Sequence, residues 1–295
     1  MTEGKHWPEK RRVTIVGAVI NLLLSAGKVA GGIFGQSQAL IADGVHSLSD
    51  LASDGLVLLA ARFGSREADH NHPYGHERIE TLATLGVGLI LLSIGAAFLI
   101  DSATRLLEPS RQLDPGWLAL WIAVLSVLTK EVLYHYTVRV ARRTDSALLV
   151  ANAWHHRSDA FSSVVVIFGV AGAMMGMRWL DSVAAAVVGV MLGWVGWRLL
   201  GSAATELVDT GLSNRELQAL SETIDAVQGV ATHDNLRSRR MGGRIFVDVR
   251  IHVDARLTVE EAETIGQRVS KRMIDQLPGQ ADVVISLASD NQPGG

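Results

Sequence analysis

Long apolar stretches alternate with short polar ones along residues 13–204, and a different pattern follows them. A helix needs about 20 predominantly apolar residues to cross a lipid bilayer. Six stretches reach that length, and each predicts a membrane-spanning helix: 13–34, 39–61, 82–107, 117–136, 147–177 and 180–204. We therefore expect residues 1–208 to form a polytopic α-helical membrane domain with six transmembrane helices.

From residue 209 onward the long apolar stretches give way to the amphipathic patterns of a soluble domain. Residues 213–227 and 258–277 place apolar residues at helical spacing, whereas residues 244–254 alternate between polar and apolar. Ser213 is a candidate helix N-cap, and Thr258 with Glu261 matches the capping-box pattern. Two further strands are expected near 233–240 and 281–288. The order α-β-β-α-β predicts a small cytosolic α+β domain, ferredoxin-like or metallochaperone-like, at residues 209–290, with its helices on one face of a sheet. A disordered tail is expected at 291–295.

Positive charge gathers in alternate connections between the apolar stretches. Cytoplasmic loops of membrane proteins carry an excess of lysine and arginine. The basic residues are Lys5, Lys10, Arg11 and Arg12 before the first stretch, Arg62, Arg66 and Arg78 in the second connection, and Arg139, Arg142 and Arg143 in the fourth. Both termini are therefore predicted to be cytoplasmic, which agrees with an even number of spans. The first stretch lacks a small-residue cleavage site and is interpreted as a membrane helix, not a removable signal peptide.

Composition narrows the chemistry that the chain can carry. Charged residues make up 19% of it, against about 25% in typical soluble domains. The formal net charge of −3 gives no indication of a nucleic-acid partner. The absence of cysteine excludes disulfides and thiolate metal sites, which leaves histidine, aspartate and glutamate as the ligands for a metal ion.

Ionisable residues interrupt the second and fifth stretches. Inserting each of them at membrane depth costs about 2.5–3.5 kcal/mol. The second stretch places four such residues at intervals of three and four, so that they share one helical face: Asp43, His46, Asp50 and Asp54. The fifth places His155 four residues before Asp159. Two His-x-x-x-Asp pairs on two helices offer four nitrogen and oxygen ligands, a set that suits tetrahedral zinc.

Simpler interpretations of the buried polar residues remain open. A single histidine in a membrane helix is more often part of a helix–helix hydrogen bond. His156 is interpreted as packing elsewhere or as contacting the metal ligands without binding the ion. Asp43 and Asp54 can line a wet cavity. Pairing between helices is expected for Asn21, Lys28, Lys130 and Glu131, and close helix packing for Gly189 and Gly193.

A second histidine cluster lies in the connection that follows the second stretch. Asp69, His70, His72 and His76 fall within eight residues, and a turn at 73–75 would fold His72 and His76 together. The alternatives are a second metal site and an ordinary solvated loop.

These features together resemble the cation diffusion facilitator family. The most specific segments are ALIADGVHSLSD, DHNHPYGHERIE and ANAWHHRSD, and the likeness covers nearly the whole chain. The family exports divalent transition metals from the cytoplasm in exchange for protons and works as a homodimer. The resemblance therefore implies a secondary active transporter of a bacterial inner membrane, not an enzyme, with metal ions, protons and the lipid bilayer as its partners.

The resemblance also implies roles for particular residues. It assigns the transport site to His46, Asp50, His155 and Asp159, and a cytoplasmic loop site to Asp69, His72 and His76. Histidine at the first of the two span-two positions is typical of zinc-preferring members, although Fe²⁺, Co²⁺, Cd²⁺ and Mn²⁺ remain alternatives. Arg78 and Asp209 occupy positions where members form a charge pair that steadies the dimer.

The C-terminal domain departs from the family pattern. His233 matches a metal-binding position, but the last strand has no histidine, and Glu263 stands where some members have one. A full binuclear site is not expected; His233 and Asp248 remain candidates for weak metal binding, or the domain serves mainly in dimerisation.

Two rival functions differ in what they require of the sequence. An intramembrane metalloprotease would need His-Glu-x-x-His, which no apolar stretch contains. A non-transporting scaffold or metal sensor, acting through the C-terminal domain, remains an alternative.

Overall fold

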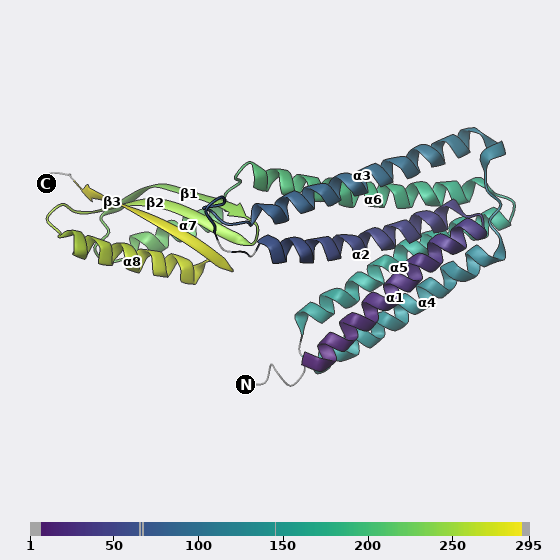
Figure 1. Ribbon diagram of the computed structural model, residues 1–295, viewed down its shortest axis with the longest axis horizontal. Coiled ribbons are helices and arrows are strands. Elements are labelled where there is room, and N and C mark those ends of the chain that lie inside the picture. The colour runs from purple at the N-terminus through teal and green to yellow at the C-terminus, as the bar shows by residue number, and fades with distance from the viewer. Residues whose placement is uncertain (1–6, 65, 67, 145, 291–295) are drawn as a thin grey trace. The chain divides into compact units, whose positions relative to one another are not determined.

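The computed structural model describes residues 7–64, 66, 68–144 and 146–290, so Lys5 and the expected tail at 291–295 lie outside the described residues (Figure 1). The chain divides into two compact units. One holds the described residues of Met1–Leu56 together with Val87–Arg198, and the other holds those of Val57–Gly86 and Leu199–Gly295.

Each of the six apolar stretches forms a long helix. The helices are α1 (Trp7–Phe34), α2 (Gln38–Gly64), α3 (Arg78–Leu107), α4 (Trp117–Arg143), α5 (Ala147–Met174) and α6 (Trp179–Leu207), with a short 3-10 helix η2 (Pro109–Arg111) between α3 and α4. Several ends differ from the expectation by a few residues, and α1 and α3 begin earlier than predicted, at Trp7 and Arg78. Helix α4 continues past residue 136, and α5 stops at Met174 because Gly176 adopts a φ of +101°, a left-handed conformation that ends helices.

Five of these helices, among the described residues, are long and apolar enough to cross a membrane: α1, α3, α4, α5 and α6. The protein is thus an integral membrane protein. Helix α2 is long enough but less apolar than these five, because acidic residues recur along it, including Asp43, Asp50 and Asp54. Six spans are therefore not confirmed.

Small residues let the membrane helices approach closely. Helices α3 and α6 run side by side in Figure 1, and a Cβ added to Gly95 would lie 2.7 Å from both the Gly189 oxygen and the Gly193 nitrogen. The close packing expected for Gly189 and Gly193 is thereby confirmed. A second buried cluster joins α2, α4, α5 and α6, and it consists of alanine, valine and one leucine.

The start of α2 is fixed by a carboxylate from α6. Asp181 accepts hydrogen bonds from the Ser37 hydroxyl at 2.6 Å and from the Gln38 backbone N–H at 2.7 Å. A carboxylate is favourable there because the first turn of a helix has unpaired N–H groups and a positive dipole end. The contact holds the start of α2 against the start of α6.

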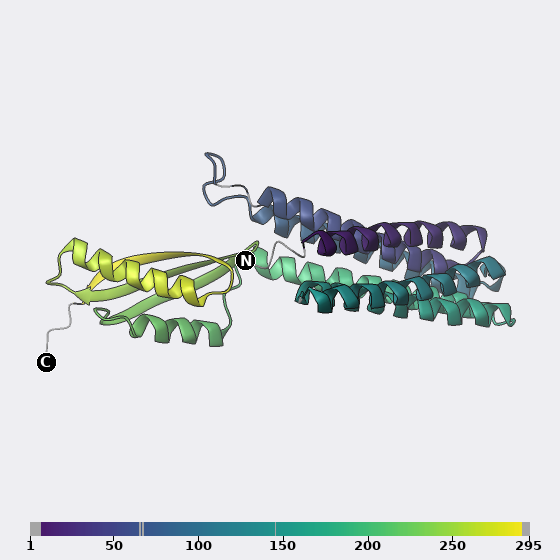
Figure 2. The same cartoon turned by 90° about the horizontal axis from the view of Figure 1, so that it is seen from below.

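The second unit contains the α-β-β-α-β order expected from the sequence. Its elements are α7 (Asn214–Asp225), β1 (Thr232–Met241), β2 (Arg244–Asp254), α8 (Val259–Gln276) and β3 (Gln280–Asp290). The sheet order is β1-β2-β3, with β1 antiparallel and β3 parallel to the central strand; the strands are labelled in Figure 1, and Figure 2 shows them from below. Both predicted helix starts are confirmed, since Ser213 with Glu216 and Thr258 with Glu261 form complete capping boxes.

One face of the central strand makes the core of this unit. Val247, Val249 and Ile251 pack with Ile224 of α7 and Val269 of α8 in a single buried cluster. Both helices therefore cover the same face, as predicted. The opposite face carries Asp248, Arg250 and His252, of which the first two are exposed.

Candidate metal centres

A small cavity of about 110 Å³ in the helical unit collects most of the predicted transport residues. Helix α2 contributes Asp50 and Asp54 to its lining, and α5 contributes His155 and Asp159. Helices α1 and α4 complete the wall, with Asn21 and Lys130 among the residues that line it. A space lined by carboxylates and imidazoles within a bundle of apolar helices is chemically suited to a small cation.

Three potential ligands come within reach of one ion. Side-chain ligand atoms of Asp50, His155 and Asp159 all lie within 4.8 Å of one another. Asp159 is nearly buried, Asp50 is 20% exposed and His155 is about half exposed at its side chain. The i,i+4 spacing on α5 puts His155 Nδ1 3.8 Å from Asp159 Oδ1. The structure thus brings together three of the four residues predicted for this site.

The fourth predicted ligand, His46, lies one helical turn before Asp50. Its Nδ1 is 3.6 Å from Asp50 Oδ2, which is too long for a hydrogen bond. That nitrogen is buried and has no hydrogen-bond partner among the described residues. Buried polar atoms are nearly always paired, so an unpaired imidazole nitrogen beside the carboxylate fits a ligand for a metal ion. The role of His46 stays a prediction.

Lys130 is a site residue that the sequence analysis did not assign to this cavity. Its Nζ donates a 2.7 Å hydrogen bond to Asp159 Oδ2, and its side chain is 1% exposed. Pairing between helices was expected for Lys130 and is confirmed, although the sequence did not identify the partner. A lysine at membrane depth is itself a signal of function, because its charge must be paired.

A second buried ion pair joins α1 to α2. Lys28 Nζ lies 2.8 Å from Asp43 Oδ2, and both side chains are fully buried. Asp43 also accepts hydrogen bonds from Ser162 at 2.6 Å and Ser163 at 2.7 Å, while Lys28 donates to Ser47 at 3.1 Å. The interpretation that Asp43 lines a wet cavity is therefore wrong, because its carboxylate is enclosed by partners. Asp54, in contrast, lines the cavity of about 110 Å³, and its role stays a prediction.

His156 is directed toward α1. It is 2% exposed, and its Nδ1 lies 3.5 Å from the amide nitrogen of Asn21. The described residues place it outside the cluster of Asp50, His155 and Asp159. Adjacent histidines on one helix point about 100° apart, which explains why His155 and His156 meet different neighbours.

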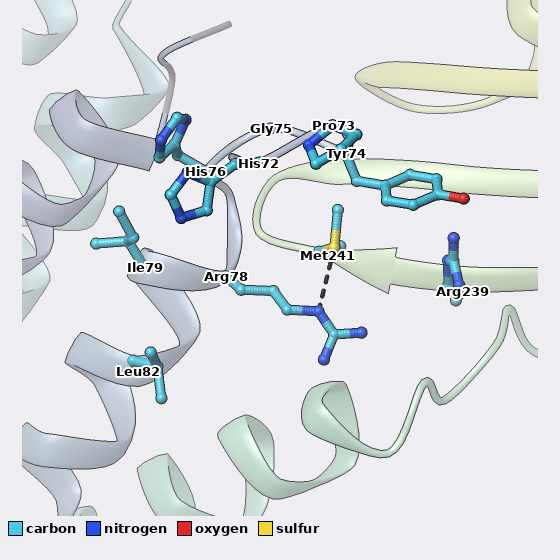
Figure 3. A pocket seen from close by; sticks show the side chains of 10 residues that line it. All are labelled: His72, Pro73, Tyr74, Gly75, His76, Arg78, Ile79, Leu82, Arg239 and Met241. Carbon is cyan, nitrogen blue, oxygen red and sulfur yellow. Dashed lines mark hydrogen bonds between the residues drawn. The ribbon is translucent and has the colours of Figure 1, made fainter. Parts of the chain in front are cut away.

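The loop between α2 and α3 forms a second cluster in the other unit. Asp69 Oδ1 lies 3.2 Å from His72 Nδ1, and Asp69 Oδ2 lies 3.4 Å from His76 Nε2. The two imidazole rings are 4.3 Å apart between centroids (Figure 3). The turn expected at 73–75 is present, with Gly75 at a φ of +88° and its N–H bonded to the His72 carbonyl. His70 lies outside this cluster.

The carboxylate of this loop is held ionised by its own backbone. The N–H of His72 donates to Asp69 at 2.7 Å, and this hydrogen bond, before all other favourable contacts, lowers the pKa of Asp69. The loop cluster borders a wider cavity of about 510 Å³, which Arg78, Arg239 and Met241 also line (Figure 3). An anionic Asp69 with two imidazoles is a three-ligand set for a divalent ion.

Arg78 and Asp209, the predicted charge pair, are in contact within one chain. Arg78 Nη2 donates to Asp209 Oδ1 at 2.8 Å, and both side chains are nearly half exposed. Glu206, close by, accepts hydrogen bonds from Thr81 and from the backbone N–H of Gly242. These contacts tie the start of α3 and the end of α6 to the β1–β2 turn.

We expect the Arg78–Asp209 pair to contribute little to the stability of the single chain. Asp209→Asn removes the charge and suits the φ of +56° at this position, since asparagine tolerates that conformation. Exposed ion pairs contribute about 0–1 kcal/mol, so the free energy of unfolding should fall by less than about 1 kcal/mol. Chemical unfolding of both proteins measures this; a loss well above that figure would contradict the assignment as a solvent-screened pair.

His233 and Asp248 are not brought together in the chain. His233 pairs in register with Ile251, whereas Asp248 pairs with Arg237 beyond a register shift in β1. The His233 imidazole is instead held by Asp225 at 2.8 Å and Ser221 at 3.0 Å. Within one chain these two residues therefore cannot share an ion, because strand positions three residues apart are separated by about 10 Å.

Comparison with known protein families finds a match over most of the chain. A model of the cation efflux transmembrane domain matches residues 14–208. A model of the cytoplasmic domain of cation efflux proteins matches residues 212–287.

Individual proteins show the same likeness. Metal tolerance protein C1 of Arabidopsis thaliana is 33% identical over 297 residues, covering 96% of this chain; the chain spans 63% of that protein's length. The manganese efflux system protein MneS of Bacillus subtilis (strain 168) is 30% identical over 262 residues, covering 89% of this chain and 90% of that protein. A nickel form of a MamM CTD variant is 25% identical over 27% of this chain and 100% of that chain, with a TM-score of 0.26.

Proposed function

Because this chain belongs to the cation diffusion facilitator family of cation efflux proteins, whose members are transporters and not enzymes, we propose that it exports divalent transition-metal ions from the cytoplasm in exchange for protons. One observation carries the proposal: Asp50, His155 and Asp159 converge from two helices in a cavity of the membrane unit. Two carboxylates can offset the charge of a divalent ion, and imidazoles can exchange it for protons near neutral pH.

Six membrane spans with both termini in the cytoplasm are part of this proposal. Helix α2 has 27 residues, which at 1.5 Å each reach about 40 Å and exceed a hydrocarbon core of about 30 Å. Its acidic residues need not face lipid, since Asp43 is paired with Lys28 and Asp50 lines the cavity. We place the protein in a bacterial inner membrane, where basic connections remain on the cytoplasmic side.

In the proposed cycle the ion enters from the cytoplasm and displaces protons from the site. Asp50 and Asp159 bind it as carboxylates, His155 binds through an imidazole nitrogen, and His46 becomes the fourth ligand once its unpaired nitrogen turns to the ion. The helices then open outward, and reprotonation of these groups releases the metal. This alternating access keeps the site accessible from one side at a time.

Zinc is the metal we propose first, because two nitrogen and two oxygen ligands suit its tetrahedral coordination. Manganese is a second candidate, favoured by two observations. A relative with 30% identity is named a manganese efflux protein, and the cavity offers further oxygen donors from Asn21 and Asn152. Oxygen donors suit Mn²⁺ better than nitrogen-rich sets do.

Transport by the purified protein in lipid vesicles tests the function and the metal together. We expect metal uptake into vesicles loaded at acidic pH, driven by the outward proton gradient, and no uptake when the gradient is collapsed. Competition of Zn²⁺ and Mn²⁺, with Fe²⁺, Co²⁺ and Cd²⁺ as further competitors, ranks the substrates. A protein that binds metal but moves none across the bilayer would instead support the scaffold or sensor alternative.

The loop cluster is proposed as a second metal site, and Asp69→Asn tests it. Since the pKa of Asp69 lies below its usual value of about 3.8, the carboxylate is ionised at pH 6 and at pH 7.5 alike. The negative charge that Asp69 contributes to metal binding is fully present above pH 3.8, and it is lost only as the pH falls through the lowered pKa. We expect Asp69→Asn to weaken zinc binding at this site about tenfold, and the factor should be similar at both pH values.

The loop measurement is a zinc titration of the Asp50→Asn protein, in which the membrane site is weakened. His70→Gln is the matched control, because His70 belongs to the same loop but lies outside the three-residue cluster. An effect of Asp69→Asn that vanishes at pH 6 would contradict the role of an ionised Asp69.

We further propose that the protein works as a homodimer. The matching C-terminal family model is named for a dimer, and the edge strand β3 exposes the apolar side chain of Val284 at 54%. Apolar side chains exposed on a strand at the edge of a sheet are suited to contact a second copy. The molar mass of the detergent-solubilised protein, measured by light scattering with the detergent subtracted, distinguishes a dimer from a monomer.

A further inference from the structure

A buried cation already lies inside the candidate transport site. The Lys130 ammonium is held by Asp159 at 2.7 Å, and the lysine side chain is 1% exposed. The contact joins α4 to α5, so the lysine comes from a helix that provides none of the predicted ligands. A charge removed from water is stable only when it is paired, which keeps the ammonium at this carboxylate.

The two oxygens of Asp159 face different neighbours. Oδ2 accepts the hydrogen bond from Lys130, whereas Oδ1 lies 3.8 Å from His155 Nδ1. A divalent ion that binds among Asp50, His155 and Asp159 therefore approaches a carboxylate whose Oδ2 already accepts a hydrogen bond from an ammonium. The ammonium and the metal are both cations, and they are drawn to the same acceptor.

Lys28, which is also buried, cannot take this role. Lys28 is held by Asp43, Ser47 and Ser163, and Asp43 is enclosed on its other side by Ser162. Arg157 lies on the same helix as Asp159, but its guanidinium is 3.8 Å from Glu131 and its side chain is 41% exposed. Among the described residues, Lys130 is the cation in contact with the clustered ligands.

We propose that Lys130 is a tethered cation that competes with the transported divalent ion for Asp159. In the metal-free site it offsets the repulsion between the carboxylates of Asp50 and Asp159. In the loaded site its positive charge weakens metal binding, which helps the ion to leave after the helices open. The inference rests on the proposed transport function, and it makes Lys130 a residue that sets affinity through charge without being a metal ligand.

The test compares metal affinity with turnover in Lys130 variants. All proteins carry His72→Ala and His76→Ala, so that titration with ZnCl₂ or MnCl₂ in detergent reports the membrane site. Lys130→Met removes the charge and the hydrogen bond, Lys130→Gln removes the charge but can still donate to Asp159, and Lys130→Arg keeps both. Arg157→Gln is the matched control, since it removes an exposed cation from α5.

We expect both neutral variants to bind metal on the order of tenfold more tightly, because a like charge beside the ion is removed in a medium of low dielectric constant. In vesicles their KM should fall together with kcat, as release becomes slow. Lys130→Arg and Arg157→Gln should stay near the parent affinity. Monodisperse elution and thermal unfolding confirm that each variant is folded, and Lys130→Gln is the variant that best preserves the helix contact.

Two results would overturn the inference. If Lys130→Met binds metal more weakly and Lys130→Gln restores the parent affinity, Lys130 only positions Asp159 by its hydrogen bond. If both neutral variants keep the parent affinity, the ammonium does not compete with metal. The proposed function fails separately, when the parent protein with an intact Lys130 neither binds metal at this site nor transports it.

Discussion

Asp159→Asn should reduce metal transport to the background of empty vesicles, a loss of more than about 100-fold. Asp159 is the residue on which the site depends most, because it is nearly buried and belongs to the three-ligand cluster. The amide has nearly the same shape as the carboxylate but cannot offset the charge of a divalent ion. Measurement of zinc and manganese uptake under a pH gradient, at matched protein density in the vesicles, gives the result directly.

The loss must be separated from misfolding, because Asp159→Asn also leaves Lys130 without its anionic partner. Two further variants make that separation. Asp50→Asn removes a clustered carboxylate that has no lysine partner among the described residues, and it should abolish transport as well. Asp54→Asn is the matched control, since Asp54 lines the same cavity one turn from Asp50 but lies outside the cluster.

Asp54→Asn should retain at least half of the parent transport rate. Equal losses in Asp54→Asn and Asp159→Asn would indicate that any carboxylate in the cavity suffices, and full transport by Asp159→Asn would remove this residue from the site. Because Asp50 and Asp54 share a helix face, the comparison depends on ligand geometry and not on the net charge of the cavity.

The parts of the site that sequence alone could predict are those set by local geometry. Residues four apart stack on one helical face, so the pairing of His155 with Asp159 follows from spacing. The Pro-Tyr-Gly turn is local too, and it brings His72 and His76 together as expected. The capping boxes of α7 and α8 belong to the same class.

The parts that could not be predicted depend on how helices are rotated and at what depth they meet. Lys130 could be identified as a buried lysine that needs a partner, but its choice of Asp159 depends on the packing of α4 against α5. Likewise, Asp43 shares a helix face with His46 and Asp50, yet it pairs with Lys28 because α1 lies against that part of α2. Spacing shows which residues share a face, and tertiary packing decides what each one meets.

That second pair, Lys28 with Asp43, should be the most important single ion pair for the stability of the helical unit. Its two charges are fully buried, and three serines complete their hydrogen bonds. Removing one member of such a pair leaves an unpaired charge, which costs about 3–5 kcal/mol. We expect Lys28→Met and Asp43→Asn each to lower the free energy of unfolding by about that amount.

The double variant Lys28→Met with Asp43→Asn distinguishes a charge effect from a loss of packing. With both charges absent, no unpaired charge remains, and the amide introduced at position 43 can still accept from Ser162, so most of the lost stability should return. Arg178→Met is the control, because Arg178 pairs with Asp114 at 2.5 Å while both side chains are more than half exposed, and its loss should cost less than about 1 kcal/mol. Unfolding in mixed micelles measures all four proteins. Additive losses in the double variant would show that Lys28 and Asp43 stabilise the fold independently, and the buried charge pair would then not be the cause.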